Sequence, residues 1–397
     1  MPLQLEGIRV VDLTSVVMGP YATQILADLG ADVIVIEDRN GDTNRSMGTG
    51  SSPGLSGVSL NLMRNKRSVG LDIKSPDGYA VLQQLVATAD AFVTNLRPGS
   101  RQRAGVTYGD IQSMRPDIVY CAAAGFPADG PRADDPAYDD VVQAASGMGD
   151  LARRAGLPVS VSPTIMADKL SGMAMAQAIT AALFHRLRTG DGADLTMAMT
   201  EVVRSFVLVE HGAGRILHPP VGDAGYPRVL DPGRRPQPTV DGYISVLPYE
   251  RHHYEALFRV AGREDLAVDG RLATRASRLE HSPQLYQDVA AIIATRTTAE
   301  WMDVLPRVGV PCTPIATLEE MIDELDLAEH PEAGMYRVVP PIVAPFVSAD
   351  AVVRRPAPLH GQHGREVLAE VGYTEIEIQA LTTSGTLFQT PREPPTR

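Results

Sequence analysis

One carboxylate opens the longest helix-like stretch of the chain. Asp168 lies near the start of a segment rich in small and apolar residues, from Thr164 to Glu201. Leucine, methionine and isoleucine recur there at roughly helical spacing, and several alanines would let the helix pack closely on its neighbours. Gly190 is placed to end this helix. An acidic residue in a first turn is a common cap, so the pattern alone predicts a capping role for Asp168.

Basic residues gather in two segments of a chain whose formal net charge is -12. They are Arg64, Lys66, Arg67, Arg97, Arg101 and Arg103. Such groups pair with phosphate oxygens, although scattered arginines more often form a solvated charged face. The acidic net charge argues against nucleic acid as a partner.

Histidine and cysteine predict neither a metal site nor a disulfide framework. The two cysteines, Cys121 and Cys312, lie far apart in the sequence, and His252 and His253 lack a third ligand at metal spacing. The apolar runs are shorter than the roughly 18 residues of a membrane span. The first residues lack the layout of a signal peptide. We therefore expect a cytoplasmic protein without a membrane partner.

The N-terminal half has the pattern of an open, mostly parallel, doubly wound α/β sheet. Short apolar, β-branched runs predict five strands, at residues 8–13, 32–37, 68–73, 89–94 and 117–122. Helix signals lie between them, as in consecutive β-α-β units. The first turn holds only Gly19-Pro20 rather than a Gly-x-Gly-x-x-Gly motif, so we do not expect a nucleotide redox cofactor.

The sequence also predicts how the chain is divided. A large α/β domain covers residues 1–213, and a proline-rich stretch at 214–240 marks a crossing between domains. A smaller α/β domain covers 226–325, with helices near 250–261, 283–296 and 298–308. Residues 330–390 return to complete the large domain, and 391–397 form a disordered tail.

Several short motifs occur in an order that resembles the family III CoA-transferases, the superfamily of formyl-CoA transferase, carnitine CoA-transferase and 2-methylacyl-CoA racemase. They are LEGIRVVDLTSVVMGPYATQILADLGADVIVIE at the start, MRNKRS at 63–68, NLRPG at 95–99, PAYD at 136–139, the ADKLSG helix start at 167–172, and RRPAPLHGQHGREVLAEVGY near the end. Each motif is weak alone, but together they span almost the whole chain.

The resemblance implies that Asp168 is a catalytic nucleophile and that the reaction moves coenzyme A from an acyl-CoA to a small carboxylic acid. Asp168 would form a mixed anhydride with the acyl group and then an aspartyl-CoA thioester. Coenzyme A would be substrate and product, with no permanently bound cofactor. Glycine turns near Gly19 and Gly147, and the helix start at Asp168, are candidates for stabilising the oxyanion.

The resemblance also implies a set of binding residues. Lys66, Arg67 and Arg103 would pair with phosphates of coenzyme A, Asn95 and Leu96 would lie near the nucleotide, and Tyr138 would lie at the thioester. Val17 and Arg39 occupy further positions of the expected site, and Asp139 is a weaker candidate. Many members have an arginine or glutamine in the loop where this chain has Ser15, Val16 and Val17, and Asp38 occupies a position that is often basic.

The resemblance further implies an interlocked homodimer and leaves two alternatives. A 2-methylacyl-CoA racemase shares the fold and the aspartate but needs a second acid/base group. Racemases carry a histidine where this chain has Tyr138, and the reference pKa of tyrosine, about 10, suits that task poorly. The second alternative is a CoA-binding protein without turnover.

Overall fold

The computed structural model describes residues 2–343 and 352–389. The chain forms two compact units. The first comprises residues 1–146, 162–206 and 325–397, and the second comprises 147–161 and 207–324. The segment 147–161 thus belongs to the second unit, although we expected it within the large domain. The expected tail at 391–397 lies outside the described residues.

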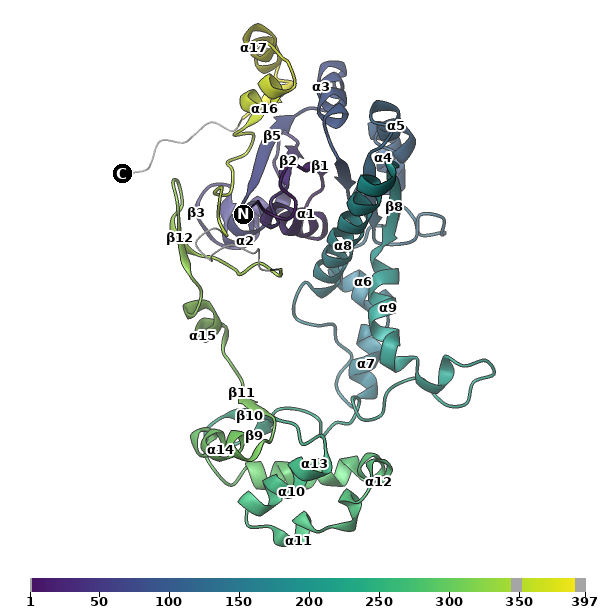
Figure 1. The fold of residues 1–397 in the computed structure, drawn as a ribbon, viewed down its shortest axis with the longest axis vertical. Helices are drawn as coiled ribbons and strands as arrows, with labels where there is room; N and C mark the ends of the chain where they lie inside the picture. Colours follow the sequence, from purple (N-terminus) through teal and green to yellow (C-terminus); the bar gives the residue numbers. More distant parts are fainter. Residues whose placement is uncertain (1, 344–351, 390–397) are drawn as a thin grey trace. The chain divides into compact units, whose positions relative to one another are not determined.

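A seven-stranded sheet forms the centre of the first unit (Figure 1). Its strands are β1 (Arg9–Leu13), β2 (Asp32–Glu37), β5 (Lys66–Leu71), β6 (Ala91–Thr94), β7 (Val119–Ala124), β8 (Ala193–Ala198) and β14 (Leu387–Phe388). They lie in the order β14-β5-β2-β1-β6-β7-β8. Only β14 runs antiparallel to its neighbour. The prediction of a mixed α/β fold with a large, mostly parallel sheet is confirmed.

Helices cover both faces of this sheet. Those of the first unit are α1 (Met18–Asp28), η1 (Thr43–Ser46), α2 (Gly57–Leu62), α3 (Pro76–Ala87), α4 (Pro98–Ala104), α5 (Tyr108–Met114), α6 (Asp139–Ala145), α8 (Met166–Thr189), α16 (Gly364–Glu370) and α17 (Glu375–Thr383). Short ladders pair β3 (Gly50–Ser52) with β4 (Leu55–Ser56) and β12 (Leu327–His330) with β13 (Gly334–Arg337). One core cluster joins alternate strand residues such as Val11 and Phe92 to α3, α5, α16 and α17. The residues between them, such as Val10 and Val93, are equally buried on the other face.

The order of the parallel strands determines where a ligand can bind. Taken in chain order, they run third, second, first, fourth, fifth and sixth across the sheet. The chain therefore changes direction between β1 and β6. In open α/β sheets, ligands bind at such a switch point, in the crevice at the carboxyl ends of the strands. The loops after β1 and β6 are thus the first place to look for a site.

The second unit packs helices against a small antiparallel sheet. Its elements are α7 (Met148–Arg154), η2 (Ala213–Arg215), β9 (Gln237–Pro238), β10 (Tyr243–Val246), α10 (Arg251–Val260), α11 (Glu264–Ala267), η3 (Gly270–Leu272), α12 (Arg275–Glu280), α13 (Ser282–Ile293), α14 (Thr298–Val304), η4 (Pro306–Val308), β11 (Cys312–Pro314) and α15 (Leu318–Asp323), and α9 (Met199–His211) contains the boundary between the units. Its core includes Leu257, Leu285 and the buried Trp301.

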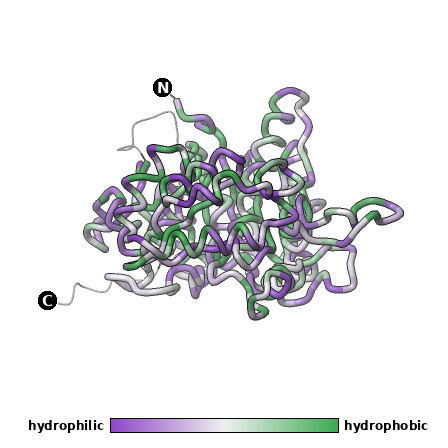
Figure 2. Tube along the Cα trace, turned by 90° about the horizontal axis from the view of Figure 1, so that it is seen from below, coloured by the Kyte–Doolittle hydropathy of each residue, from purple (hydrophilic) through white to green (hydrophobic). Residues whose placement is uncertain are grey.

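Hydrophobic and hydrophilic residues alternate along the trace rather than gathering in one long apolar segment (Figure 2). Among residues 2–343 and 352–389, no helix combines the length and apolar composition that crossing a membrane requires. The cytoplasmic location expected from the sequence stays a prediction.

Candidate active site

A side chain at the end of β6 fastens the loop that follows β1. Asn95 accepts a hydrogen bond from the Ser15 backbone N–H over 3.1 Å and donates its amide to the Ser15 carbonyl over 2.7 Å. The two loops at the switch point are therefore joined directly. This gives Asn95, which we expected near the nucleotide, a positioning role within the crevice.

A buried carboxylate holds the next residue of the same loop. The Val16 N–H donates to Oδ1 of Asp42 over 2.9 Å, and Asn44 N–H donates to the same oxygen over 2.9 Å. Val16 needs this support because its φ of 72° lies in the left-handed region, which a β-branched residue rarely adopts. Within the described part of the chain, Oδ2 of Asp42 is buried without a hydrogen-bond partner. Burial, with Glu37 and Asp12 nearby, raises the pKa of Asp42 to about 6.

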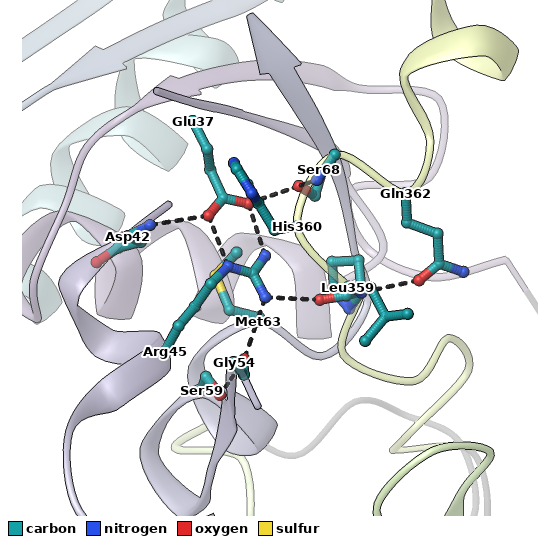
Figure 3. A network of polar contacts seen from close by, with 12 residues as sticks. Glu37, Asp42, Arg45, Gly54, Ser59, Met63, Ser68, Leu359, His360 and Gln362 are labelled. Carbon is teal, nitrogen blue, oxygen red and sulfur yellow. Dashed lines mark hydrogen bonds and ion pairs between the residues drawn. The ribbon is translucent and has the colours of Figure 1, made fainter. Parts of the chain in front are cut away.

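An ion pair fixes the segment that carries Asp42 (Figure 3). Arg45 binds both oxygens of Glu37 over 2.7 and 2.6 Å and donates to the Pro358 carbonyl over 2.9 Å. Glu37 also accepts from the Asp42 N–H over 2.9 Å and from the Ser68 hydroxyl over 2.5 Å. Because both charges are buried and each has several partners, this pair keeps the loop after β2 in one conformation.

Asp168 is the third residue of α8, and another helix supplies the cap for its backbone. The N-cap residue Ile165 offers no side-chain hydrogen bond. Instead, Oδ1 of Asp139, in the first turn of α6, accepts from the Asp168 N–H over 3.0 Å. The Gln143 amide donates to the other oxygen of Asp139 over 2.5 Å, and its carbonyl oxygen accepts from Ser162 N–H over 2.9 Å. The Asp168 side chain is therefore left free of capping.

The surroundings of Asp168 change its acidity. Its side chain is half-buried, and the Asp139 carboxylate lies nearby. Burial, with this neighbouring charge, raises the pKa of Asp168 to about 6. A carboxylate with a raised pKa is more basic and less well solvated than a free one, and perturbed groups of this kind often mark functional sites.

Helices α8 and α1 lie side by side (Figure 1), and Gly172, one turn beyond Asp168, allows their close approach. A Cβ at Gly172 would lie 2.7 Å from the Met18 carbonyl oxygen and 3.2 Å from the Tyr21 ring. Both helices begin at the carboxyl edge of the sheet, because α1 follows β1 and α8 precedes the parallel strand β8. Since a helical turn rises about 5.4 Å, Asp168 lies level with the loop between β1 and α1. The structure thus brings Asp168 and Val17 to the same edge.

Two of the expected phosphate ligands have other partners. Lys66 is fully buried, and its ammonium donates to the Pro20 carbonyl over 2.8 Å and to the Thr23 hydroxyl over 2.7 Å, with Asp12 at 3.4 Å. Burial lowers the pKa of Lys66. In place of the expected phosphate contact, these bonds give Lys66 a structural role beneath α1.

Arg67 is likewise occupied by carboxylates. Its guanidinium pairs with Asp32 over 2.6 Å, with Glu370 over 2.6 Å and with Glu366 over 3.2 Å. These partners raise the pKa of Arg67 despite its burial. A phosphate would have to displace three acids, so we leave both Lys66 and Arg67 out of the site proposed below.

The remaining expected residues lie at the surface or in the packing around the crevice. Arg103 is exposed on α4, where it donates to the Ser100 hydroxyl over 2.9 Å. Tyr138 precedes α6 and is 71% exposed. Arg39 donates to the Gly385 carbonyl over 2.6 Å and stacks on the Phe388 ring, so it fastens the edge strand β14. Val17 is buried before α1, and Leu96 packs against the core.

Sequence reasoning missed Asp42 and underrated Asp139. The signal for Asp42 was slight: an aspartate after Gly41, in a loop that follows a strand. Asp139 stood beside Tyr138 in a recognised motif, but its partner on α8 lies 29 residues away in the chain. Within the residues that the structure describes, no group of three or more histidines, cysteines and acids could hold a metal ion.

A model of CoA-transferase family III matches residues 5–364. The chain belongs to CoA-transferase family III. The prediction that it is an enzyme of this family is therefore confirmed.

Several characterised relatives cover nearly the whole chain. It is 31% identical to a succinate–glutarate CoA-transferase of Agrobacterium fabrum, over 92% of this chain and 95% of that protein. It is 31% identical to a succinyl-CoA:glutarate CoA-transferase of Mus musculus, over 97% of this chain and 90% of that protein. It is also 31% identical to a formyl-CoA:oxalate CoA-transferase of Streptomyces avermitilis, over 98% and 100%.

Solved structures of the family have the same fold. The Rv3272 protein of Mycobacterium tuberculosis matches with a TM-score of 0.76 and 29% identity, over 92% of this chain and 99% of that one. A CaiB/BaiF family protein from Brucella suis matches with a TM-score of 0.76 and 25% identity, over 94% of this chain and 100% of that one.

Proposed function

We propose that this CoA-transferase uses Asp168 as a covalent nucleophile to move coenzyme A from an acyl-CoA thioester to a free carboxylic acid. The observation that carries the proposal is the setting of Asp168. Its backbone is held by Asp139, its carboxyl group is half-buried with a raised pKa, and it lies level with the loop at the topological switch point.

The reaction can be written as four balanced displacements. The Asp168 carboxylate attacks the thioester carbonyl, the C–S bond breaks, and a mixed anhydride and the CoA thiolate result. The thiolate attacks the Asp168 carbonyl of the anhydride and releases the first acid as a carboxylate, which leaves an aspartyl-CoA thioester. The acceptor carboxylate then attacks this thioester, the C–S bond breaks, and a second anhydride and the CoA thiolate form. Attack of the thiolate on the acceptor's acyl carbon releases the new acyl-CoA and regenerates Asp168, with no net transfer of protons.

Each attack places negative charge on a carbonyl oxygen, which needs hydrogen-bond donors. Val17 is apolar, so its side chain cannot donate a hydrogen bond and its backbone N–H is the one donor it offers. The first N–H groups of a helix have no partner within the helix. Those of α1 lie beside the loop fixed by Asn95 and Asp42. We infer that the backbone at the start of α1 supplies the donors.

Coenzyme A also needs cations for its phosphates. Arg103 is exposed on α4, directly after the β6 loop that carries Asn95 and Leu96. Its one hydrogen bond to protein is to the neutral Ser100 hydroxyl among the described residues, so a phosphate would displace no carboxylate. We therefore keep Arg103 as the proposed phosphate contact.

The central test is transfer itself. Incubation with succinyl-CoA and a panel of acids, including glutarate and oxalate, should yield a new acyl-CoA that mass spectrometry identifies. Asp168→Asn should lower the rate by at least about a thousandfold, the scale for loss of a nucleophile, while Asp140→Asn, an exposed acid one helix away, should not. Transfer that persists in Asp168→Asn would refute the nucleophile.

The same assay separates transfer from racemisation and from binding alone. Tyr138 stands where racemases have histidine, and its side chain is 71% exposed. We expect 2-methylacyl-CoA in deuterated water to gain no deuterium at the α-carbon. Rapid exchange without transfer to any acid would favour a racemase, and CoA binding with neither reaction would favour a binding protein.

The proposal includes a homodimer of interlocked chains. Apolar side chains are exposed along α8 and α9, with Phe184 60%, Leu187 84% and Phe206 50% accessible. Such a stripe is typical of a surface that a partner covers, and the resemblance implies a second copy. Light scattering at micromolar concentration should give twice the 42.6 kDa of one chain, and a monomer would contradict it.

A further inference from the structure

A pocket in the second unit is lined mainly by cationic and aromatic side chains. The lining side chains are Arg228, Tyr249, Glu250, Tyr254, Arg275, Arg278, Leu279 and Ser282. Three arginines against one glutamate make the pocket positively charged, although the chain as a whole is acidic.

The buried member of this group has no anionic partner. Arg228 is only 8% exposed, and its guanidinium stacks over the Tyr249 ring at 3.9 Å. Its hydrogen bonds go to the Tyr286 hydroxyl and the Pro248 carbonyl, each over 3.4 Å. Both are neutral, and both distances exceed the 2.7–3.2 Å usual for such bonds. In the described part of the chain, no carboxylate forms an ion pair with Arg228.

The other two arginines leave this charge unbalanced. Arg278 already pairs with Glu250 over 3.2 Å and donates to the Leu272 carbonyl over 3.0 Å. Arg275 is exposed at the rim. Glu250, the one carboxylate in the pocket lining, is thus paired with Arg278. The positive charge of Arg228 therefore has no counter-ion in the pocket.

A guanidinium is always charged and carries five donors in a flat fork. Burying it with only neutral acceptors at long distances is costly, because the charge loses its water and gains little in return. Structures keep such a group where an anion completes it, as in bidentate pairing with a carboxylate or phosphate. Of the tyrosines around Arg228, Tyr249 and Tyr254 line the pocket and would flank such an anion.

We propose that this pocket binds an oxyanion group, with Arg228 as the principal ligand and Arg275 closing the rim. The group can be the carboxylate of a small organic acid or a phosphate. The proposal concerns the second unit by itself and does not depend on the role of Asp168.

The test measures anion binding by calorimetry with glutarate, inorganic phosphate and chloride as separate probes. Binding of glutarate would identify a carboxylate site, and binding of phosphate would identify a phosphate site. Arg228→Gln should lower the affinity for the bound anion at least about tenfold, as expected for loss of a charged hydrogen-bond partner. Arg259→Gln is the matched control, because Arg259 is an exposed arginine of the same unit outside the pocket.

Repeating the titrations in Asp168→Asn separates this pocket from the proposed active site. Binding that survives in Asp168→Asn and is lost in Arg228→Gln supports the pocket, whatever the outcome for transfer. If Arg228→Gln does not fold, Arg275→Gln should weaken binding several-fold in its place. Absence of binding by glutarate and phosphate, or equal losses in Arg228→Gln and Arg259→Gln, would overturn the proposal.

Discussion

The backbone N–H of Asp168 donates to Oδ1 of Asp139 over 3.0 Å, so this carboxylate fixes the position of Asp168 and adds its charge to burial, the larger cause, in raising the pKa of Asp168. The bond orders the first turn of α8, and the charge on Asp139 disfavours a second charge nearby. Asp139 is itself held by Gln143. Position and acidity of the proposed nucleophile therefore depend on a neighbouring helix.

The first prediction concerns pH. Because the pKa of Asp168 is about 6, the carboxylate is the main form above pH 6 and the unreactive acid is the main form below it. We expect kcat/KM to fall about tenfold per pH unit below 6. Initial rates from pH 4.5 to 8 measure this, and a rate that stays level down to pH 5 would contradict the assignment.

The second prediction concerns Asp139. Asp139→Asn keeps an oxygen that can accept from the Asp168 N–H but removes the charge, so the pKa of Asp168 should fall. The acid limb of the pH–rate profile should move to lower pH. Asp139→Ala also removes the cap, which costs about 1 kcal/mol of stability. Asp140→Asn, in the same turn but exposed, should change neither the pH–rate profile nor the stability. A pH–rate profile that does not move in Asp139→Asn would show that the charge of Asp139 does not act on Asp168.

The third prediction concerns the contact between α8 and α1. Gly172→Ala places a Cβ 2.7 Å from the Met18 carbonyl oxygen, so the helices must separate. We expect a loss of about 1–3 kcal/mol, as for other overpacked sites, together with a lower kcat. Gly109→Ala is the control, because nothing lies within 4 Å of its Cβ, and helix propensity favours alanine there by about 1 kcal/mol. Equal stabilities in urea unfolding would contradict the close approach.

The fourth prediction concerns Arg103. If its guanidinium pairs with a phosphate, Arg103→Ala should raise the Kd for coenzyme A and reduce the dependence of binding on salt. Arg188→Ala, an exposed arginine in the last turn of α8, should leave both unchanged. Calorimetry at two salt concentrations measures the Kd for coenzyme A and its dependence on salt. An unaltered Kd in Arg103→Ala would remove Arg103 from the site.

The fifth prediction concerns the buried Asp42. Its pKa is raised from 3.8 to about 6, so protonation favours the folded state. This stabilisation is complete below pH 4 and is lost as the pH rises through 6, by about 3 kcal/mol at most. Asp42→Asn does not titrate, so its unfolding free energy should fall less than that of the wild type between pH 4 and 7. Asp38→Asn is an exposed control, and its unfolding free energy should depend on pH as that of the wild type does. The same dependence in Asp42→Asn would contradict the inferred titration of Asp42.

Local signals in the sequence predicted most individual elements. Apolar, β-branched runs identified β1, β2, β6 and β7, and the capping box of Thr297 and Glu300 marked the start of α14. These signals act between residues close in the chain, which is why they can be read without a structure. The strand expected at 68–73 instead spans Lys66–Leu71, because its backbone pairs with β2 from Lys66 onwards, a long-range contact that no local pattern reveals.

The sequence by itself determined the family and the parallel α/β architecture, and it supplied the proposal that Asp168 is the nucleophile. Only the tertiary structure decided which groups each charged side chain contacts. Lys66 and Arg67 look like free cations in the sequence, but Asp12, Asp32 and Glu370 lie far from them in the chain and neutralise them in the fold. Asp139 and Asp42 gain their roles in the same way, from contacts across loops. The energy of a buried charge depends on which groups surround it, and those groups become neighbours only when the sheet forms.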